Sequence, residues 1–243
     1  MIDPRTFHGF REHVSEHMYT VMKQPIIEVQ SGEISHYEWL VRFEHEAGVQ
    51  GVIRPAEISG AIKDLDLSML ARAVLTLNKY PEGHGMAVNL SGASIDLPGF
   101  EHALLACLSA LEGPAHKLII ELTETWDLEN LHKAKDILTK LRDRGHKICL
   151  DDVGAGAASI RYLRALPADY LKIDGEFVVS SMNNDREKAI LEALFTLRES
   201  LGFKYIAEGV ETDQIMDFVR SMGFDAAQGY AIGKPTPETR LEV

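Results

Sequence analysis

The chain has 243 residues, 45% of them hydrophobic, which is enough to build a substantial core. Its 25 Lys and Arg residues against 37 Asp and Glu residues give a formal charge of −12. This balance argues against binding of DNA or RNA through a basic face, which needs clustered positive charge. No apolar run is as long as a membrane span, so we expect no membrane contact from this chain. The two cysteines, Cys107 and Cys149, lack metal-ligand spacing, and we expect a reducing, cytoplasmic location.

Short apolar runs recur along the chain and predict eight strands. They are QPIIEV (24–29), HYEWLVRF (36–43), GMAVNLS (85–91), KLIIELTE (117–124), KICLDDV (147–153), YLKIDG (170–175), KYIAEGV (204–210) and AAQGYAIG (226–233). Segments with helical periodicity lie between them, at 64–80, 99–111, 127–144, 185–200 and 212–221. Residues 1–23 are expected to form an N-terminal helix.

The alternation of strands and helices predicts a parallel sheet, and eight strands in a chain of this length predict an α/β fold, a (β/α)8 TIM-like barrel. The first two strands are joined by a short turn containing Ser31 and Gly32, which is too short for a crossover helix. One strand near the N-terminus is therefore expected to be antiparallel. No Pro/Gly/Ser-rich linker divides the chain, so we expect a single domain over 1–243, with its motifs between 24 and 237.

Polar side chains end several of the predicted strands: Asn89, Glu121, Asp151, Asp152, Lys172 and Glu208. In a barrel the C-terminal strand ends meet at one mouth. Carboxylates that converge there repel each other, by about 4 kcal/mol for a pair at about 4 Å, and bound cations compensate this repulsion. All-oxygen ligands suit Mg²⁺ or Mn²⁺. Two adjacent aspartates at a strand end are therefore expected to serve two neighbouring metal ions.

Each of these residues also has a simpler explanation. A strand-end Asp often caps the next helix, Asn89 can start a turn, and Lys172 can form an ordinary salt bridge. Glu124 and Glu211 suit the first turn of a helix, where negative charge is favourable. The ten histidines show no HxxxH or HExxH spacing and are interpreted as structural or exposed. The collective pattern of acidic and amide groups at several strand ends favours the metal site.

An ordered set of motifs runs through nearly the whole chain. It comprises QPI, YEWLVRF, VNLS, ELTE, DDVGAG, LPADYLKID, IAEGVET and QGYAIGKP. With these motifs in this order the chain resembles the EAL domain, the bacterial phosphodiesterase module that hydrolyses cyclic di-GMP to linear pGpG. The resemblance implies hydrolysis assisted by two metal ions. The metals then supply the attraction that lets an acidic protein bind a dianionic ligand.

The resemblance also implies a role for each matched residue. The ligands of two Mg²⁺ or Mn²⁺ ions are expected to be Glu38, Asn89, Glu121, Asp151 and Asp152. Glu208 is expected to be a further ligand or the base for the attacking water, and Lys172 to orient that water and stabilise charge on the phosphate. Substrate contacts are expected from Arg42, Leu40 and Gln228, and supporting roles from Glu124 and Glu211. Ca²⁺ is expected to support binding but to inhibit turnover, because its bonds are longer and its geometry looser.

One departure from the family pattern lies in the second predicted strand, where Trp39 replaces the family's alanine. Side chains alternate between the two faces of a strand, so Glu38, Leu40 and Arg42 share one face. Trp39 is therefore expected to point away from the site, toward the helices.

Two further departures lie in DDVGAG, where Val153 and Ala155 replace the family's Phe and Thr, and this loop is expected to reduce activity. It leaves an alternative function: a cyclic di-GMP receptor that hydrolyses its ligand slowly or not at all and signals by occupancy. A partner-binding module without a nucleotide is the least favoured hypothesis. The resemblance also implies a homodimer formed through elements beside this loop.

Overall fold

The computed structural model describes residues 19–44, 48–123, 131–153 and 159–238. The strands in this part of the chain are β1 (Thr20–Glu28), β2 (Ile34–Arg42), β3 (Gly85–Ser91), β4 (Leu118–Thr123), β5 (Lys147–Val153), β6 (Tyr170–Ile173), β7 (Lys204–Ala207), β8 (Ala226–Ala227) and β9 (Thr236–Pro237). The helices are α2 (Gly48–Ser59), α3 (Ile62–Lys79), α4 (Gly92–Asp96), α5 (Phe100–Leu108), α6 (Leu131–Asp143), α7 (Ser159–Ala165), α8 (Gly175–Asn183), α9 (Asp185–Leu201) and α10 (Asp213–Met222), with a short 3-10 turn η1 (Ala115–Lys117).

Strands β1 to β8 close into a barrel, because β1 pairs with β8 on one side and with β2 on the other. The strands from β2 to β8 pair in parallel, whereas β1 is antiparallel to both of its neighbours. β9 pairs with β1 outside this ring. The (β/α)8 barrel and the antiparallel strand near the N-terminus are thus confirmed.

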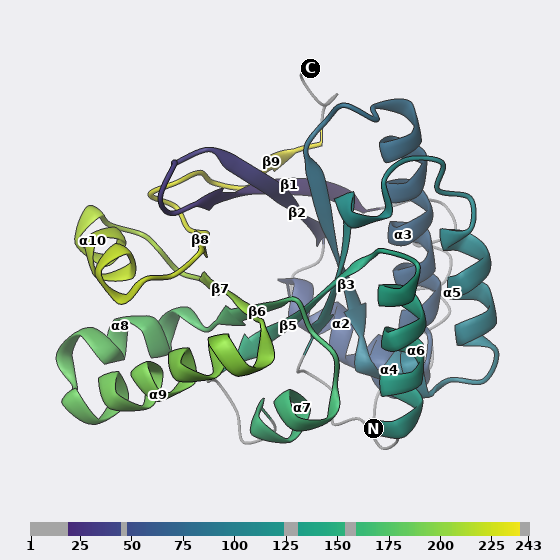
Figure 1. Cartoon of the computed structure of the whole chain (residues 1–243). Coiled ribbons are helices and arrows are strands. Elements are labelled where there is room, and N and C mark those ends of the chain that lie inside the picture. The colour runs from purple at the N-terminus through teal and green to yellow at the C-terminus, as the bar shows by residue number, and fades with distance from the viewer. Residues whose placement is uncertain (1–18, 45–47, 124–130, 154–158, 239–243) are drawn as a thin grey trace.

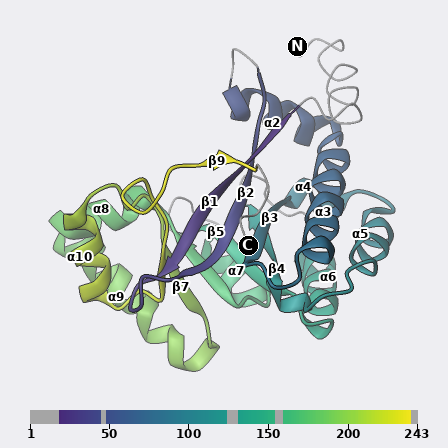
Figure 2. The same cartoon turned by 90° about the horizontal axis from the view of Figure 1, so that it is seen from above.

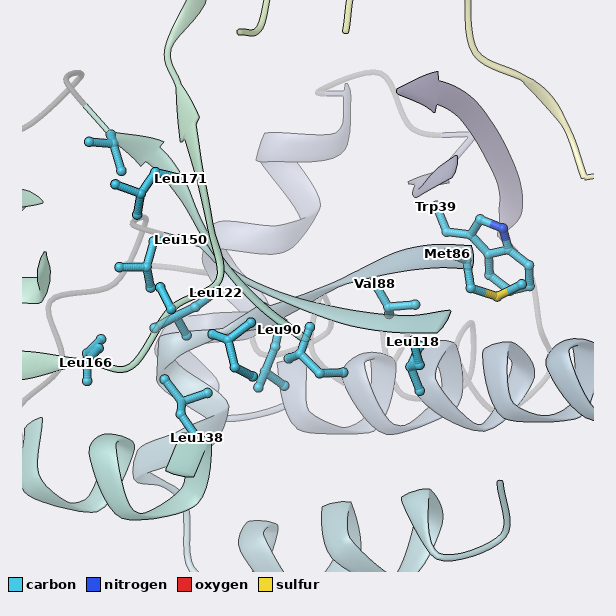
Figure 3. Close-up of a cluster of buried hydrophobic side chains, with 14 of the residues drawn as sticks. Trp39, Met86, Val88, Leu90, Leu118, Leu122, Leu138, Leu150, Leu166 and Leu171 are labelled. Atoms are coloured by element: carbon cyan, nitrogen blue, oxygen red, sulfur yellow. The ribbon is translucent and has the colours of Figure 1, made fainter. Parts of the chain in front are cut away.

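Helices cover the outside of the barrel (Figures 1 and 2), with α3, α5 and α6 on one side and α8, α9 and α10 on the other. Their apolar side chains pack against the outward-facing strand residues in one large core cluster. Part of this cluster is shown in Figure 3, where Trp39 lies with Met86 and Leu118. Trp39 is 1% exposed. It therefore belongs to the layer between strands and helices, as the alternation along β2 predicts.

The inward-facing side chains form a second, smaller apolar cluster. We call it the apolar layer, and it consists of Ile26, Ala87, Ile119, Cys149, Ile206 and Ala226. These residues come from six of the eight barrel strands and are at most 6% exposed. This layer fills the barrel on the side of the N-terminal ends of the parallel strands, so the interior is packed there.

Several element boundaries differ from the predicted ones. The expected N-terminal helix over 1–23 lies mostly outside the described residues, but Thr20–Lys23 belong to β1, which begins four residues earlier than expected. The last predicted strand, 226–233, is reduced to Ala226–Ala227. The chain turns at Gly229, where a Cβ atom would lie 2.1 Å from the Val210 carbonyl oxygen. Only glycine fits this approach, and it ends the strand.

The five predicted helices correspond to α3, α5, α6, α9 and α10, while residues 127–130 at the expected start of α6 lie outside the described residues. α2, α4, α7 and α8 were not predicted. Among the helices in the described ranges, none combines the length and the apolar character that crossing a membrane requires.

Candidate functional site

Next to the apolar layer, toward the C-terminal ends of the parallel strands, each barrel strand or the residue directly after it places one polar side chain toward the barrel axis. We call this set the polar ring, and it consists of Gln24, Glu38, Asn89, Glu121, Asp151, Lys172, Glu208 and Gln228. Hydrogen bonds and ion pairs connect all of its members in one network. Six of the eight lie two residues from a member of the apolar layer, as the pleat of a strand requires. The ring lies at the C-terminal ends of the parallel strands, where barrel enzymes carry their active sites.

Lys172 on β6 is the centre of the polar ring. Its side chain is 1% exposed, and Nζ lies 2.8 Å from Glu208, 3.1 Å from Asp151, and 3.3 Å from both Glu38 and Glu121. Burial alone would lower the pKa of Lys172, but these four negative charges outweigh it and raise the pKa well above its usual value. Lys172 is therefore a buried ammonium ion surrounded by carboxylates from four strands.

Glu38 on β2 accepts hydrogen bonds from Gln228, Asn89 and Lys172. Gln228 Nε2 donates to Glu38 Oε2 at 2.6 Å, and Asn89 Nδ2 donates to Oε1 at 3.0 Å. Gln228 Nε2 also lies 3.2 Å from Gln24 Oε1. Burial alone would raise the pKa of Glu38, but the charge of Lys172 and the hydrogen bonds from Gln228 and Asn89 lower it. Glu38 is thus a fixed, ionised carboxylate at the wall of the barrel.

A β-bulge explains how two adjacent aspartates reach the same side of β5. Leu150 pairs with Leu171 and Val153 pairs with Ile173, so Asp151 and Asp152 together stand opposite the single residue between those partners. Leu150 and Val153 both belong to the outer core cluster. The extra residue therefore interrupts the alternation of side chains along the strand.

The backbone of Asp152 absorbs this interruption. Asp152 has a φ of 54°, the only positive φ of a non-glycine residue in the described ranges. Aspartate tolerates this left-handed conformation better than β-branched residues do. Asp151, Asp152 and Glu208 each offer a carboxylate oxygen, and these oxygens lie within 4.8 Å of one another. The bulge thus lets one strand contribute two carboxylates to the same site.

Glu208 directly follows β7, beside the end of β6. Two glycines permit this close approach, since a Cβ atom on Gly209, whose φ is +64°, would lie 3.0 Å from the Cα of Gly175. Burial, opposed by the charge of Lys172 and reinforced by that of Asp151, raises the pKa of Glu208 to about 8. Glu208 therefore holds a proton more readily than an exposed glutamate does.

The donor set of the ring fits divalent metal ions with a preference for oxygen. Burial and the charges of Glu38, Asp151 and Glu208 raise the pKa of Glu121 well above its usual value, although Lys172 opposes them. Glu121 Oε1 is buried and has no hydrogen-bond donor among the described residues. Asp151 Oδ1 contacts Lys172 Nζ without the geometry of a hydrogen bond. Buried carboxylate oxygens without donors are suitable ligands for a hard cation such as Mg²⁺ or Mn²⁺.

A cavity of about 440 Å³ opens beside the ring. Glu38, Asn89, Asp151 and Asp152 line it, together with Leu40 and Arg42 farther along β2. The guanidinium of Arg42 donates to the Val41 carbonyl oxygen at 2.9 Å. Leu40 and Arg42 thus lie next to the predicted metal ligands, where contact with a bound ligand was expected.

Gln228 was expected to contact the ligand as well. It is 4% exposed and donates a hydrogen bond to Glu38, so in this structure its side chain holds that carboxylate in place.

The other predicted site residues lie farther from Lys172 or outside the described residues. Glu211 is exposed and lines a second cavity, of about 650 Å³, together with Glu208. Within the described ranges no hydrogen bond or ion pair joins it to Lys172, and its supporting role stays a prediction. Glu124 and Ala155 lie outside the described residues, whereas Val153 is buried in the core cluster.

Sequence reasoning missed three polar residues near the site. Gln24 belongs to the ring, and its position two residues before the inward-facing Ile26 on β1 could have indicated this. Glu57 and Asp66 are buried at the cavity wall, at 3% and 5% exposure. They lie on helices, so the search for polar residues at strand ends could not find them.

Comparison with known proteins assigns the chain to one family. The family model of the EAL domain matches residues 10–235. The cyclic di-GMP phosphodiesterase PdeB of Shewanella oneidensis is 32% identical over 228 residues, covering 87% of this chain and 26% of that protein. The cyclic di-GMP phosphodiesterase PdeL of Escherichia coli is 30% identical over 238 residues, covering 94% of this chain and 65% of that protein. This chain therefore spans between about a quarter and two thirds of these relatives.

Among solved structures, one described as the PaMucR phosphodiesterase in complex with c-di-GMP superimposes with a TM-score of 0.83 and 29% identity. The match covers 96% of this chain and 98% of that chain. Its fold and extent agree with the barrel described above, and the family model extends over most of the sequence. The chain belongs to the EAL domain family.

Proposed function

We propose that this chain hydrolyses cyclic di-GMP to linear pGpG with two divalent metal ions, Mg²⁺ or Mn²⁺. The observation that carries the proposal is the polar ring, in which four carboxylates converge within 3.3 Å of one buried lysine. Support also comes from relatives that are named cyclic di-GMP phosphodiesterases.

The residues that would hold the two ions are Glu38, Asn89, Glu121, Asp151 and Asp152, with Glu208 at their edge. When bound, such ions lower the pKa of a coordinated water and neutralise charge on the phosphate. The bulge on β5 supports the assignment of two ions, since it turns two adjacent carboxylates toward one site.

The protein's own groups perform the remaining tasks. Glu208, whose pKa is raised to about 8, accepts the proton of the attacking water. The ammonium of Lys172, 2.8 Å from Glu208, orients that water and stabilises negative charge on the phosphate. Arg42 and Leu40 line the neighbouring cavity and contact the dinucleotide. Gln228 and Asn89 keep Glu38 in position through their hydrogen bonds.

The test is incubation of the protein with cyclic di-GMP and either Mg²⁺ or Mn²⁺, with pGpG followed by chromatography. We expect pGpG with either ion, none in excess EDTA, and strongly reduced turnover when Ca²⁺ replaces them. Full turnover in EDTA would contradict the two-metal mechanism. Tight binding without pGpG would instead favour the alternative function, a cyclic di-GMP receptor that signals by occupancy, for which the altered loop at Val153 and Ala155 gives a reason.

The remaining expectations stay predictions. They are a single domain, a cytoplasmic location and a homodimer formed through elements beside the loop that follows Asp152. Sedimentation at micromolar protein, with nucleotide and metal present, tests the homodimer.

A further inference from the structure

Lys172 forms ion pairs with four carboxylates in the described barrel interior. Its Nζ contacts Glu38 from β2, Glu121 from β4, Asp151 from β5 and Glu208 from β7, all within 3.3 Å. In the described part of the chain, Lys172 is the only cation paired with any of these four carboxylates. One ammonium therefore bridges carboxylates from four separate strands at the mouth of the barrel.

The ring depends on this charge. Four carboxylate side chains face one ammonium in a buried site. Removing one partner of a buried ion pair leaves an uncompensated charge and strongly destabilises a protein. Without Lys172, the four carboxylates would repel one another with no internal cation between them.

Lys172 also contacts the carboxylate side chains that would hold the proposed metal ions. A divalent ion binds carboxylate oxygens at about 2.0–2.2 Å, and Nζ lies within 3.3 Å of the same side chains. An ammonium and a divalent cation repel each other, so both cannot keep their full contacts with the same cluster of carboxylates. The two kinds of cation therefore compete for the carboxylates.

We propose that Lys172 is the internal counter-ion of the ligand ring: it holds the carboxylates together and releases part of its contacts when divalent ions bind. This positioning role is additional to the part of Lys172 in hydrolysis, and it rests on the metal site of the proposed function. Lys172 thereby keeps the carboxylates together in the absence of metal, and the lysine and the ions share the same carboxylate side chains.

The test is a thermal-unfolding comparison of the whole chain in excess EDTA and in millimolar Mn²⁺. Lys172→Met should lower the unfolding midpoint in EDTA by roughly 5–10 °C, and Mn²⁺ should recover most of that loss. The matched control is Lys147→Met, because Lys147 forms an ion pair with Asp169 at 3.0 Å but is 40% exposed and outside the ring. Its small effect should be the same with and without Mn²⁺.

A second variant keeps the test decisive if Lys172→Met folds poorly. Asp151→Asn, added to Lys172→Met, removes one carboxylate whose Oδ1 contacts Lys172 Nζ, and it should raise the midpoint in EDTA above that of the single variant. The proposal is overturned if Lys172→Met matches the wild type in EDTA, if it loses equal stability with and without Mn²⁺, or if Asp151→Asn gives no recovery. No cyclic di-GMP is used, so failure of the proposed hydrolysis would be seen separately.

Discussion

The barrel interior contains two layers that the same strands build only two residues apart. The apolar layer consists of five aliphatic side chains and Cys149, whereas the polar ring gathers four carboxylates and a lysine. The pleat lets one strand contribute an inward side chain to each layer, and six of the eight strands do so. Depth in the barrel therefore separates two roles: the buried apolar position packs the interior, and the position nearer the mouth gathers the charged side chains to which we assign the proposed chemistry.

The largest expected effect is on turnover, from variants in the polar ring. Glu208→Ala and Lys172→Ala should each reduce turnover of cyclic di-GMP by at least about a hundredfold, the usual scale for loss of a base or of electrostatic stabilisation. Nucleotide binding should be reduced less than turnover. Turnover is measured by pGpG formation in saturating Mn²⁺, where both variants are expected to stay folded.

The control for these variants is Glu192→Ala, since Glu192 lies on α9 with its side chain 58% exposed. It should leave turnover unchanged. Near-normal turnover in Glu208→Ala or in Lys172→Ala would show that the assigned role is wrong. The proposed difference in function between the polar ring and the apolar layer would then no longer be supported.

The next effect is on stability, from the apolar layer. Ile206 is fully buried two residues before Glu208. Ile206→Ala should reduce the free energy of unfolding by about 2–5 kcal/mol, and Ile206→Val by about 0.5–1.5 kcal/mol, because the cavity left behind is smaller. Denaturant unfolding measures both losses. Turnover per folded molecule should stay within a few fold of wild type, and a hundredfold loss would mean that the two layers are not separable.

The last effect is on the pH dependence of stability, and it comes from Asp66, a buried carboxylate that pairs with no cation in the described part of the chain. Asp66 accepts hydrogen bonds from the Ser91 amide at 3.1 Å and the Ser94 hydroxyl at 2.5 Å. Burial raises the pKa of Asp66 to about 7, opposed by these hydrogen bonds. The folded state therefore binds this proton more tightly than the unfolded state does. Stability should fall as pH rises from about 4 to 7, by up to about 1.4 kcal/mol per pH unit.

The variant Asp66→Asn keeps an acceptor for both donors but removes the ionisation. It should flatten the decline in stability over that pH range, as measured by denaturant unfolding at several pH values. Asp217→Asn is the control, since the Asp217 side chain is 76% exposed. Identical slopes for wild type and Asp66→Asn would mean that Asp66 ionises in the folded state as easily as in the unfolded state.

Much of the barrel was predictable, because buried parallel strands appear in a sequence as apolar runs. The four missed helices gave weaker signals. α2 contains Pro55, which normally interrupts a helix. α8 contains the β-branched pair Val178 and Val179, which favours a strand. The two-residue β8 was overestimated, because the backbone contact of Gly229 with Val210 is a tertiary constraint that the local pattern does not contain.

The members of the site were largely predictable, but their arrangement was not. Regular alternation predicts that Asp151 and Asp152 point to opposite faces of β5, and only the bulge brings them together. The central position of Lys172 depends on the registers of four strands, since its carboxylate partners lie between 21 and 134 residues away in sequence. Gln228 was expected to contact a ligand, and its hydrogen bond to Glu38 likewise follows from closure of the barrel.

The proposed binding of two metal ions by the polar ring can be tested by anomalous X-ray scattering. Crystals of the wild-type protein grown in Mn²⁺ would be measured at the manganese absorption edge. We predict two anomalous peaks about 3.5–4 Å apart, with Asp151 contacting both and Asp152 contacting one. The absence of any peak in contact with Asp151, or manganese bound only outside the ring, would contradict the claim.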